Sequence, residues 1–358
     1  MGRSRFIAVI CSGISFGPLL LLQAQEPPAK QVLPVEQSQS AIKGIKGKLH
    51  LHKPADEVLD SLKTLEALAD EVQGMQFQVG GLLGHPDPNV RVQAARTLAA
   101  SSQRPDIAPL TVEFLTKRLD RETNAEVVAW LLRSLARMGP YAKPEIPKFI
   151  EALKNPDPGI RRGASAVFWP FRQSDDLIPA AISALDDPDL GPDEKTGGGS
   201  VSWSAMIYLW GRRAAAKDAA PGLIKIAKSE KGDDHHRLRA LCTLAAVAPT
   251  ERLPLLTARE WLKKRDDVEL LTKATGVLSE LGVHAKEAVP DLIALANIQL
   301  FEDRAAELQA KLSIIDAFGR IGPAAKAALP TLEMLAMTKS NIVRGRALEA
   351  IKRVQAKE

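Results

Sequence analysis

One phrase recurs along this chain: a turn that holds proline with aspartate or asparagine, followed by a helix with small residues in its middle. Its clearest copies start with His85-Pro-Asp-Pro-Asn-Val-Arg and Asn155-Pro-Asp-Pro-Gly-Ile-Arg, and a looser copy starts at Ser340. Proline cannot continue the preceding helix, and an aspartate side chain accepts hydrogen bonds from the free amides that open the next one. The phrase therefore predicts a series of short helices joined by tight turns.

The helices that follow these turns align in one register. An apolar position leads, a residue that is mostly alanine follows four positions later, and an apolar residue closes the stripe after four more. Alanine at the middle position lets a neighbouring helix approach closely. The aligned copies are Val90/Ala94/Leu98, Val127/Leu131/Leu135, Ile160/Ala164/Phe168, Val201/Ala205/Leu209, His236/Ala240/Leu244, Leu270/Ala274/Leu278, Ala310/Ile314/Phe318 and Val343/Ala347/Ile351.

A second series of landmarks marks the helices between these copies. A proline stands just ahead of each Leu- or Ile-rich run, because the first turn of a helix tolerates a residue that lacks an N–H. These prolines recur every 32 to 42 residues, at Pro109, Pro147, Pro179, Pro221, Pro254, Pro290 and Pro330. Each unit is therefore a pair of helices. One pair cannot bury its own apolar stripe, so we expect neighbouring pairs to stack.

Three segments carry a resemblance to a known family. Asp87-Pro-Asn-Val-Arg91, Leu135-Ala-Arg-Met-Gly139 and Phe318-Gly-Arg-Ile-Gly-Pro323 resemble the two-helix unit of HEAT repeats. The resemblance covers about residues 67–358 and implies an all-α fold, an α-solenoid of about eight stacked antiparallel helix pairs. Because related HEAT-like families include bilin lyases and DNA glycosylases, the resemblance bears on the fold far more than on the function.

The first residues read as a signal peptide, residues 1–24. Arg3 and Arg5 form a positive start, and Phe6–Leu22 is an apolar stretch that is short for a membrane span. An uncleaved anchor is the alternative interpretation. We expect export to the periplasm or the cell exterior. Residues 25–53, rich in Pro, Gln, Lys and Gly, predict a disordered linker, which leaves 54–358 for the solenoid.

Charge and composition narrow the chemistry. The chain has 48 basic and 43 acidic residues, a mixed surface rather than one made for a polyanion. No H-E-x-x-H, G-x-S-x-G, Walker or C-x-x-C-H pattern occurs. Ser40-Ala-Ile-Lys43 and Lys195-Thr-Gly197 match two motifs of penicillin-recognising enzymes, but they lie in an arm and a loop without the strand that this chemistry needs. The pair His235-His236 after two aspartates lacks a second ligand cluster, and the acidic, Gly-rich insertion at 186–199 reads as a solvated loop. Cys242, alone once the signal peptide is removed, reads as core.

Two kinds of side chain are candidates for binding a partner. Tryptophans off the packing stripe are plausible anchors, although filling gaps between units is the plainer interpretation. Arginines one turn after an acid can line a groove for an anionic ligand, but a ladder of ion pairs between units explains them more simply. The candidate residues are Trp130, Trp169, Trp203, Trp210, Arg161 and Arg162.

The sequence thus predicts a non-catalytic scaffold that holds a protein or peptide on a concave face formed by the second helices. It implies no cofactor and leaves the partner and the oligomeric state open. Two alternatives belong to other classes. One is a HEAT-like lyase-type or accessory enzyme subunit, which fold analogy alone suggests. The other is a nucleic-acid-binding solenoid, suggested by Arg161, Arg162, Arg212 and Arg213.

Overall fold

A computed structural model describes residues 44–45, 47–68, 74–101, 104–189, 199–229 and 234–356. Within these ranges the chain forms α-helices and short 3-10 helices, without a strand. The predicted signal peptide (1–24), most of the predicted linker (25–53) and residues 190–198 of the insertion lie outside them. The described part of the solenoid starts with the helix that begins at Ala55.

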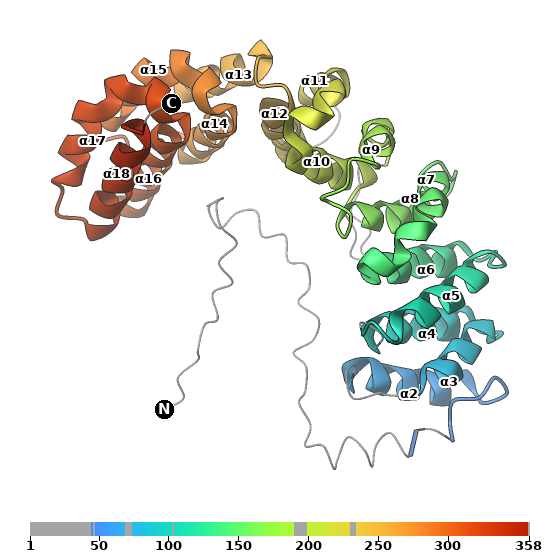
Figure 1. Cartoon of the computed structure of the whole chain (residues 1–358). Coiled ribbons are helices and arrows are strands. Elements are labelled where there is room, and N and C mark those ends of the chain that lie inside the picture. The colour runs from blue at the N-terminus through green and yellow to red at the C-terminus, as the bar shows by residue number, and fades with distance from the viewer. Residues whose placement is uncertain are drawn as a thin grey trace, which may run out of the picture.

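The helices come in two rows. After α2 (Ala55–Leu68), the first helices of successive pairs form the outer row, and the second helices form the inner row (Figure 1). The first helices are α3 (Gln76–Gly81), α5 (Ala108–Leu119), α7 (Ile146–Ala152), α9 (Ile178–Ala184), α11 (Ala220–Ala227), α13 (Arg252–Leu262), α15 (Val289–Ala296) and α17 (Leu329–Ala336). The second helices are α4 (Pro88–Ser101), α6 (Ala125–Arg137), α8 (Pro158–Ser165), α10 (Val201–Arg212), α12 (Asp234–Val247), α14 (Val268–Leu281), α16 (Arg304–Ile321) and α18 (Asn341–Val354).

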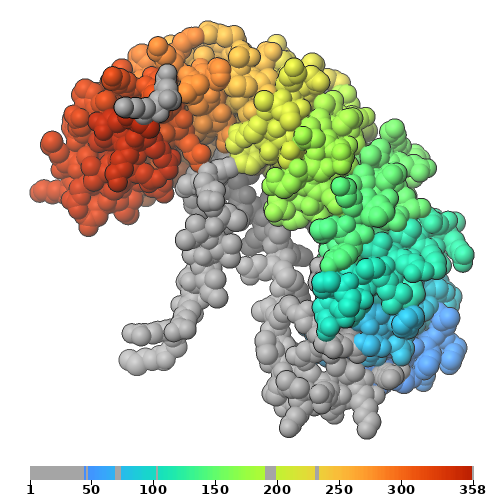
Figure 2. Space-filling model, in the orientation of Figure 1, coloured from blue at the N-terminus to red at the C-terminus, as the bar shows by residue number. Residues whose placement is uncertain are grey.

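Stacking of the inner row builds a curved body (Figure 2). Helix α2 packs on α4, α4 on α6 and α6 on α8, and the same order runs on to α16 and α18. The second helices line the concave side of the arc, as Figure 1 shows. The predicted α-solenoid of about eight helix pairs is confirmed, and the concave face consists of the predicted second helices.

The aligned apolar register forms the core. Of the predicted core positions, only Leu270 and Ile351 are partly exposed, and the others are buried. Buried threonines fix the offset between neighbouring second helices. The hydroxyl of Thr97 donates to the Leu62 carbonyl at 3.1 Å, and that of Thr243 donates to the Met206 carbonyl at 3.3 Å. Since a one-turn slip would break these bonds, they support the register that the apolar stripe sets.

The predicted helix caps are present at many second helices. Side chains of Asp157 and Ser200, for example, accept from the amides of Ile160 and Trp203 at 3.0 and 3.2 Å. Four glycines have positive φ, and three of these, Gly139, Gly282 and Gly322, begin the 3-10 segments η3 (Gly139–Glu145), η6 (Gly282–Ala288) and η7 (Gly322–Ala328). In η5 (Arg213–Ala219) the equivalent residue is Arg213, with φ 52°.

The hydrophobic core divides at α12. Ala240 and Leu244 belong to the cluster that begins at Ile45, whereas Leu241 and Ala245 belong to the cluster that ends at Val354. Helix α12 is therefore the element at which an N-terminal and a C-terminal part of the solenoid meet.

The last helix has a mixed outer face. Lys352 and Arg353 are exposed on α18. Ile342 and Leu348 on the same helix are also exposed, at 58% and 48%. Apolar residues at helical spacing therefore interrupt the polar surface that the terminal unit of a repeat array needs.

Candidate partner-binding face

The four candidate tryptophans lie on the inner row of the solenoid. Trp130 is on α6, Trp203 and Trp210 are on α10, and Trp169 follows η4 (Ala166–Phe168) at the end of α8. Trp169 is 69% exposed, and the other three are half-buried. Both sequence-based interpretations therefore apply: Trp169 stands free of the core, while the other three also fill space between units.

Each of these rings has an arginine over its face. A guanidinium near the face of an indole is attracted by the negative π-cloud, which both fixes the ring and covers it. The distances from guanidinium carbon to ring centroid are 4.9 Å for Arg96 and 5.4 Å for Arg133 over Trp130, 5.1 Å for Arg172 over Trp169, 5.0 Å for Arg239 over Trp203, and 4.6 Å for Arg213 over Trp210. The concave side thus carries a series of tryptophan–arginine stacks.

Of the arginines in these stacks, only Arg213 was named from the sequence, and then for the nucleic-acid alternative. The signal is present in the aligned register: Arg239 is three positions after its leading residue, His236, and Trp203 is two after Val201. Residues at those columns of adjacent second helices face each other once the helices stack. The alignment of the second helices identified Trp203 as a candidate but did not identify Arg239 of the next unit.

At the end of α10, one carboxylate on α14 joins two of these residues. Glu280 accepts from Trp210 Nε1 at 3.0 Å and from Arg213 Nη1 at 2.7 Å. The carboxylate side chain is only 9% exposed, and the contact passes across α12. Residues of units that are not adjacent rarely touch in a solenoid, so this bridge is local to the junction of the two cores.

Arg239 differs from the other stacked arginines in its polar contacts. It is half-buried on α12, and within the described ranges its guanidinium takes part in no ion pair or hydrogen bond. Burial lowers the pKa of Arg239, with the charges of Cys242 and Glu280 acting in the opposite direction. Glu280, the carboxylate whose charge acts on Arg239, already accepts from Trp210 and Arg213. A guanidinium stacked by its face has its edge available for a planar anion.

Arg161 and Arg162 both form intramolecular ion pairs. Arg161 donates to both carboxylate oxygens of Asp187, at 2.6 and 3.2 Å, and to the carbonyls of Asn155 and Pro156, both at 2.9 Å. Arg162 donates to Asp189 at 2.5 Å. For Arg161 the structural interpretation is confirmed, because the side chain ties its own turn to the next unit.

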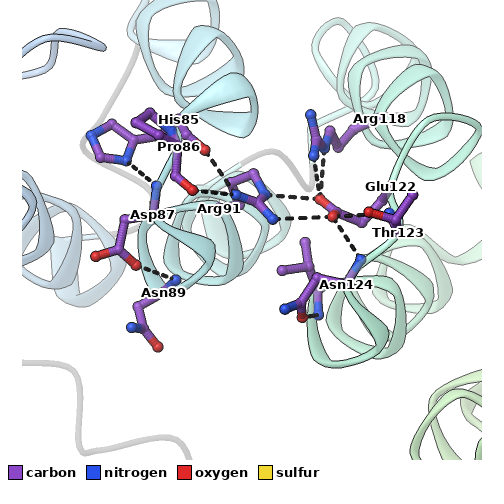
Figure 3. Close-up of polar contacts among 10 residues, drawn as sticks. His85, Pro86, Asp87, Asn89, Arg91, Arg118, Glu122, Thr123 and Asn124 are labelled. Carbon is purple, nitrogen blue, oxygen red and sulfur yellow. Dashed lines mark hydrogen bonds and ion pairs between the residues drawn. The ribbon is translucent and has the colours of Figure 1, made fainter.

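The same arrangement occurs two copies earlier, around Arg91 on α4 (Figure 3). Its guanidinium donates to the carbonyls of His85 and Pro86 at 2.9 and 2.8 Å and to Glu122 at 2.8 and 3.1 Å. Burial would raise the pKa of Glu122, but hydrogen bonds from Arg91, the Asn124 amide and Arg118 outweigh it and lower that pKa to about 2. The inter-unit ladder exists at these two places.

Farther along the chain the ladder is not continuous. Arg237 pairs with Asp234, and Lys311 pairs with Glu307 at 2.9 Å, each within its own helix. Arg344 donates to Asn341 at 2.6 Å, also within its own helix. The expected ion pair to the next unit is therefore not formed at Arg237, Lys311 and Arg344 within the described ranges, since their side-chain partners all lie in their own helices.

Two features of the described residues bear on cysteine chemistry and on metal binding. Cys242 is buried, and burial raises the pKa of its thiol to about 12, so the thiolate is not formed near neutral pH. No cluster of three metal-binding side chains occurs in these ranges; Asp233 of the weak metal candidate lies outside them. The helices of the described chain are all too short or too polar to cross a bilayer.

Comparisons with known proteins bear on the fold alone. No protein-family model and no curated protein matches the sequence. Yeast importin-β (Kap95p) aligns with a TM-score of 0.52 and 13% identity over 88% of this chain and 52% of its own. A homology model of the AP-3 complex aligns with a TM-score of 0.55 and 12% identity over 88% of this chain and 62% of its own.

This chain spans about half to three-fifths of the length of those two structures. Its fold is that of the HEAT/armadillo-type α-solenoids, as the sequence resemblance predicted. The CpcE–CpcF complex of phycocyanin lyase from Nostoc also aligns, with 17% identity over 79% of this chain and 95% of its own, but the TM-score of 0.40 is too low to bear on activity.

Proposed function

We propose that this protein is a non-catalytic scaffold that holds a protein or peptide partner along its concave face. The observation that carries the proposal is the series of tryptophan–arginine stacks on the inner row, from Trp130 to Trp210. Tryptophan and arginine are the residues most enriched among binding hot spots. Helices hold them in place before binding, which lowers the ordering cost that a partner must overcome.

Solved solenoids of this fold support a protein partner. One similar structure, with a TM-score of 0.51, holds Kap95p bound to RanGDP, and another, with a TM-score of 0.50, is a Kap95–Nup1 complex. The nucleic-acid alternative loses its basis, because Arg161, Arg162, Arg212 and Arg213 each pair with a carboxylate of this chain. Their charge is locally neutralised and offers little to a phosphate backbone.

The proposal includes export. Residues 1–24 have the composition of a signal peptide. Because such a segment directs export, the proposed location of the protein is the periplasm or the cell exterior. A fusion of these residues to a reporter enzyme that works only after export tests this point. Activity of the fusion supports export, and activity confined to the cytoplasm contradicts it.

The binding role is tested by capture with a double variant. Trp169→Ala combined with Trp203→Ala is expected to abolish recovery of the partner from an extract of the native cells, with only the modest loss of melting temperature that removal of the half-buried Trp203 ring causes. Phe77→Ala is the matched control, since Phe77 is also 69% exposed but lies on α3 in the outer row. Equal capture by the double variant and the control would refute the proposed function, and a large loss of stability would assign the two rings to the core.

A further inference from the structure

Arg239 on α12 is a cation that forms no ion pair or hydrogen bond with another described residue. Arg239 stacks on Trp203 at 5.0 Å, and within the described residues no carboxylate pairs with it. A charge that is partly removed from water is costly unless an opposite charge compensates it. Glu280, whose charge acts on Arg239, accepts hydrogen bonds from Trp210 and Arg213 instead.

The surroundings of Arg239 add an apolar contact surface. Trp203, Ile207 and Trp210 follow one another on α10 at spacings of four and three residues, which places them on one face of the helix. Ile207 is 36% exposed, and both tryptophans are half-buried. On the adjacent helix α12, Cys242 and Ala246 are small and buried, so they add no charge to this surface.

We infer that Arg239 and Trp203 form a subsite for a carboxylate side chain of an acidic peptide, with Ile207 contacting an apolar residue next to it. This inference rests on the proposed function and names the chemistry of the partner. The stacked guanidinium offers two parallel N–H groups at its edge, which match the two oxygens of an aspartate or glutamate. Burial lowers the pKa of Arg239, and a bound carboxylate would reverse that effect.

A peptide fits this face better than a single-stranded nucleic acid does. Indole faces could stack on bases, but each of these faces already has an arginine over it. The stacks also alternate with acids, because Glu66 pairs with Arg96 and Glu280 pairs with Arg213. A phosphate backbone would meet those carboxylates along its path, whereas a peptide can place one carboxylate at Arg239 and apolar residues elsewhere.

Fluorescence anisotropy with defined probes tests the subsite. The probes are three labelled peptides of four Glu-Leu-Gly repeats, four Gln-Leu-Gly repeats and four Lys-Leu-Gly repeats, and a labelled twelve-nucleotide single strand of mixed sequence. We expect the Glu peptide to bind at least about tenfold tighter than the Gln peptide, since a charge-assisted pair is roughly twice as strong as a neutral one. The Lys peptide is expected not to bind.

Variants of the full chain locate the effect. Arg239→Gln is expected to reduce affinity for the Glu peptide to that of the Gln peptide, and Arg239→Lys to restore only part of it, because lysine lacks the planar fork. Arg252→Gln is the control, an exposed arginine on α13 that pairs with Glu287. Melting of Arg239→Gln is expected at or above the wild-type temperature, since an uncompensated charge is removed.

The outcomes separate this inference from the proposed function. Equal binding of the Glu and Gln peptides, no binding of any peptide, or an unchanged Glu-peptide affinity in Arg239→Gln would overturn the carboxylate subsite. Tighter binding of the nucleic acid than of the Glu peptide would overturn it in favour of a polyanion. None of these results touches the scaffold role if capture of the native partner still depends on Trp169 and Trp203.

Discussion

Trp210 on α10 and Glu280 on α14 are joined by a 3.0 Å hydrogen bond that passes across α12. The bond lies where the hydrophobic core divides into two clusters. Arg213 adds a second contact to the same carboxylate. Because the apolar contacts are split at α12, this polar bridge is expected to hold the two parts of the arc together.

Removal of the shared carboxylate is the first test of that bridge. Glu280→Ala is expected to lower the free energy of unfolding by about 1–3 kcal/mol, the range for hydrogen bonds to charged groups. It is also expected to speed hydrogen exchange in α14, which chemical denaturation alone would not reveal. The control is Glu287→Ala, an exposed acid in η6, which should leave exchange in α14 unchanged. Unchanged exchange in Glu280→Ala would show that the bridge has no mechanical role.

Arg213 provides a test of backbone strain. Its φ of 52° is one that glycine adopts at the same place in three other units. Such a conformation costs roughly 1–3 kcal/mol for a residue with a side chain. The partly exposed ion pair with Glu280 contributes about 0.2–1 kcal/mol, and the stack on Trp210 contributes about 0.5–1 kcal/mol. Arg213→Gly is therefore expected to raise the free energy of unfolding by up to about 1 kcal/mol.

The alanine variant at this position separates strain from the ion pair. Arg213→Ala removes the ion pair with Glu280 and the stack on Trp210 and keeps the strain, so it should be less stable than both the wild type and Arg213→Gly in urea denaturation. If the glycine variant is no more stable than the alanine variant, the positive φ is not a source of strain in this protein.

Glu122 gives the fold a defined response to acid. Its pKa is lowered from 4.5 to about 2 in the folded chain, so the folded state binds its proton less readily than the unfolded state does. The resulting stability is fully present above pH 4.5 and is lost as the pH falls toward 2. At about 1.4 kcal/mol for each unit of pKa, the contribution at neutral pH is at most about 3 kcal/mol.

The measurement is urea denaturation of the wild type and Glu122→Gln between pH 2 and pH 7. The difference between their unfolding free energies should shrink steadily below pH 4.5. Glu113→Gln is the control, because Glu113 is 53% exposed in its ion pair with Lys117. A Glu122→Gln difference that stays constant over the whole range would contradict the assignment.

Close contact between α6 and α8 makes Gly163 sensitive to any side chain. A Cβ on Gly163 would lie 2.6 Å from the Ala129 carbonyl oxygen, and that atom belongs to the backbone and cannot turn aside. Gly163→Ala is therefore expected to lower the unfolding free energy by about 2 kcal/mol, because overpacking outweighs the better helix propensity of alanine. Gly276→Ala on α14 is the matched control, with no atom within 4 Å of the added carbon.

The control substitution Gly276→Ala is expected to stabilise the protein. Alanine in a helix interior is about 1 kcal/mol more favourable than glycine, so Gly276→Ala should raise the melting temperature. Equal effects of the two substitutions would mean that α6 and α8 are not in close contact.

Sequence alone predicted the solenoid because one physical rule, burial of a stripe at helical spacing, repeats through the chain. It placed Val90, Ala94 and Leu98 in the core, and it placed the prolines of the first helices. It also predicted that Arg161 ties two units together, since a capped turn followed by arginine is a local pattern.

What sequence did not provide depends on contacts between units. Trp210 and Glu280 are 70 residues apart, and no local pattern links them. The stack of Arg239 on Trp203 depends on how adjacent second helices are offset. The exposed Ile342 and Leu348 on α18 likewise follow from the position of the helix at the end of the stack, which helical spacing alone does not reveal.

The central claim, that the concave face holds the partner, is tested most directly by site-specific crosslinking. One photoreactive amino acid replaces Ile207 on α10, a helix of the inner row, and another replaces Leu256 on α13, a helix of the outer row. Both side chains are exposed in the wild type, at 36% and 48%. We expect one defined protein or peptide to crosslink from position 207 and not from position 256. Crosslinking of the same partner from position 256, with none from 207, would contradict the account.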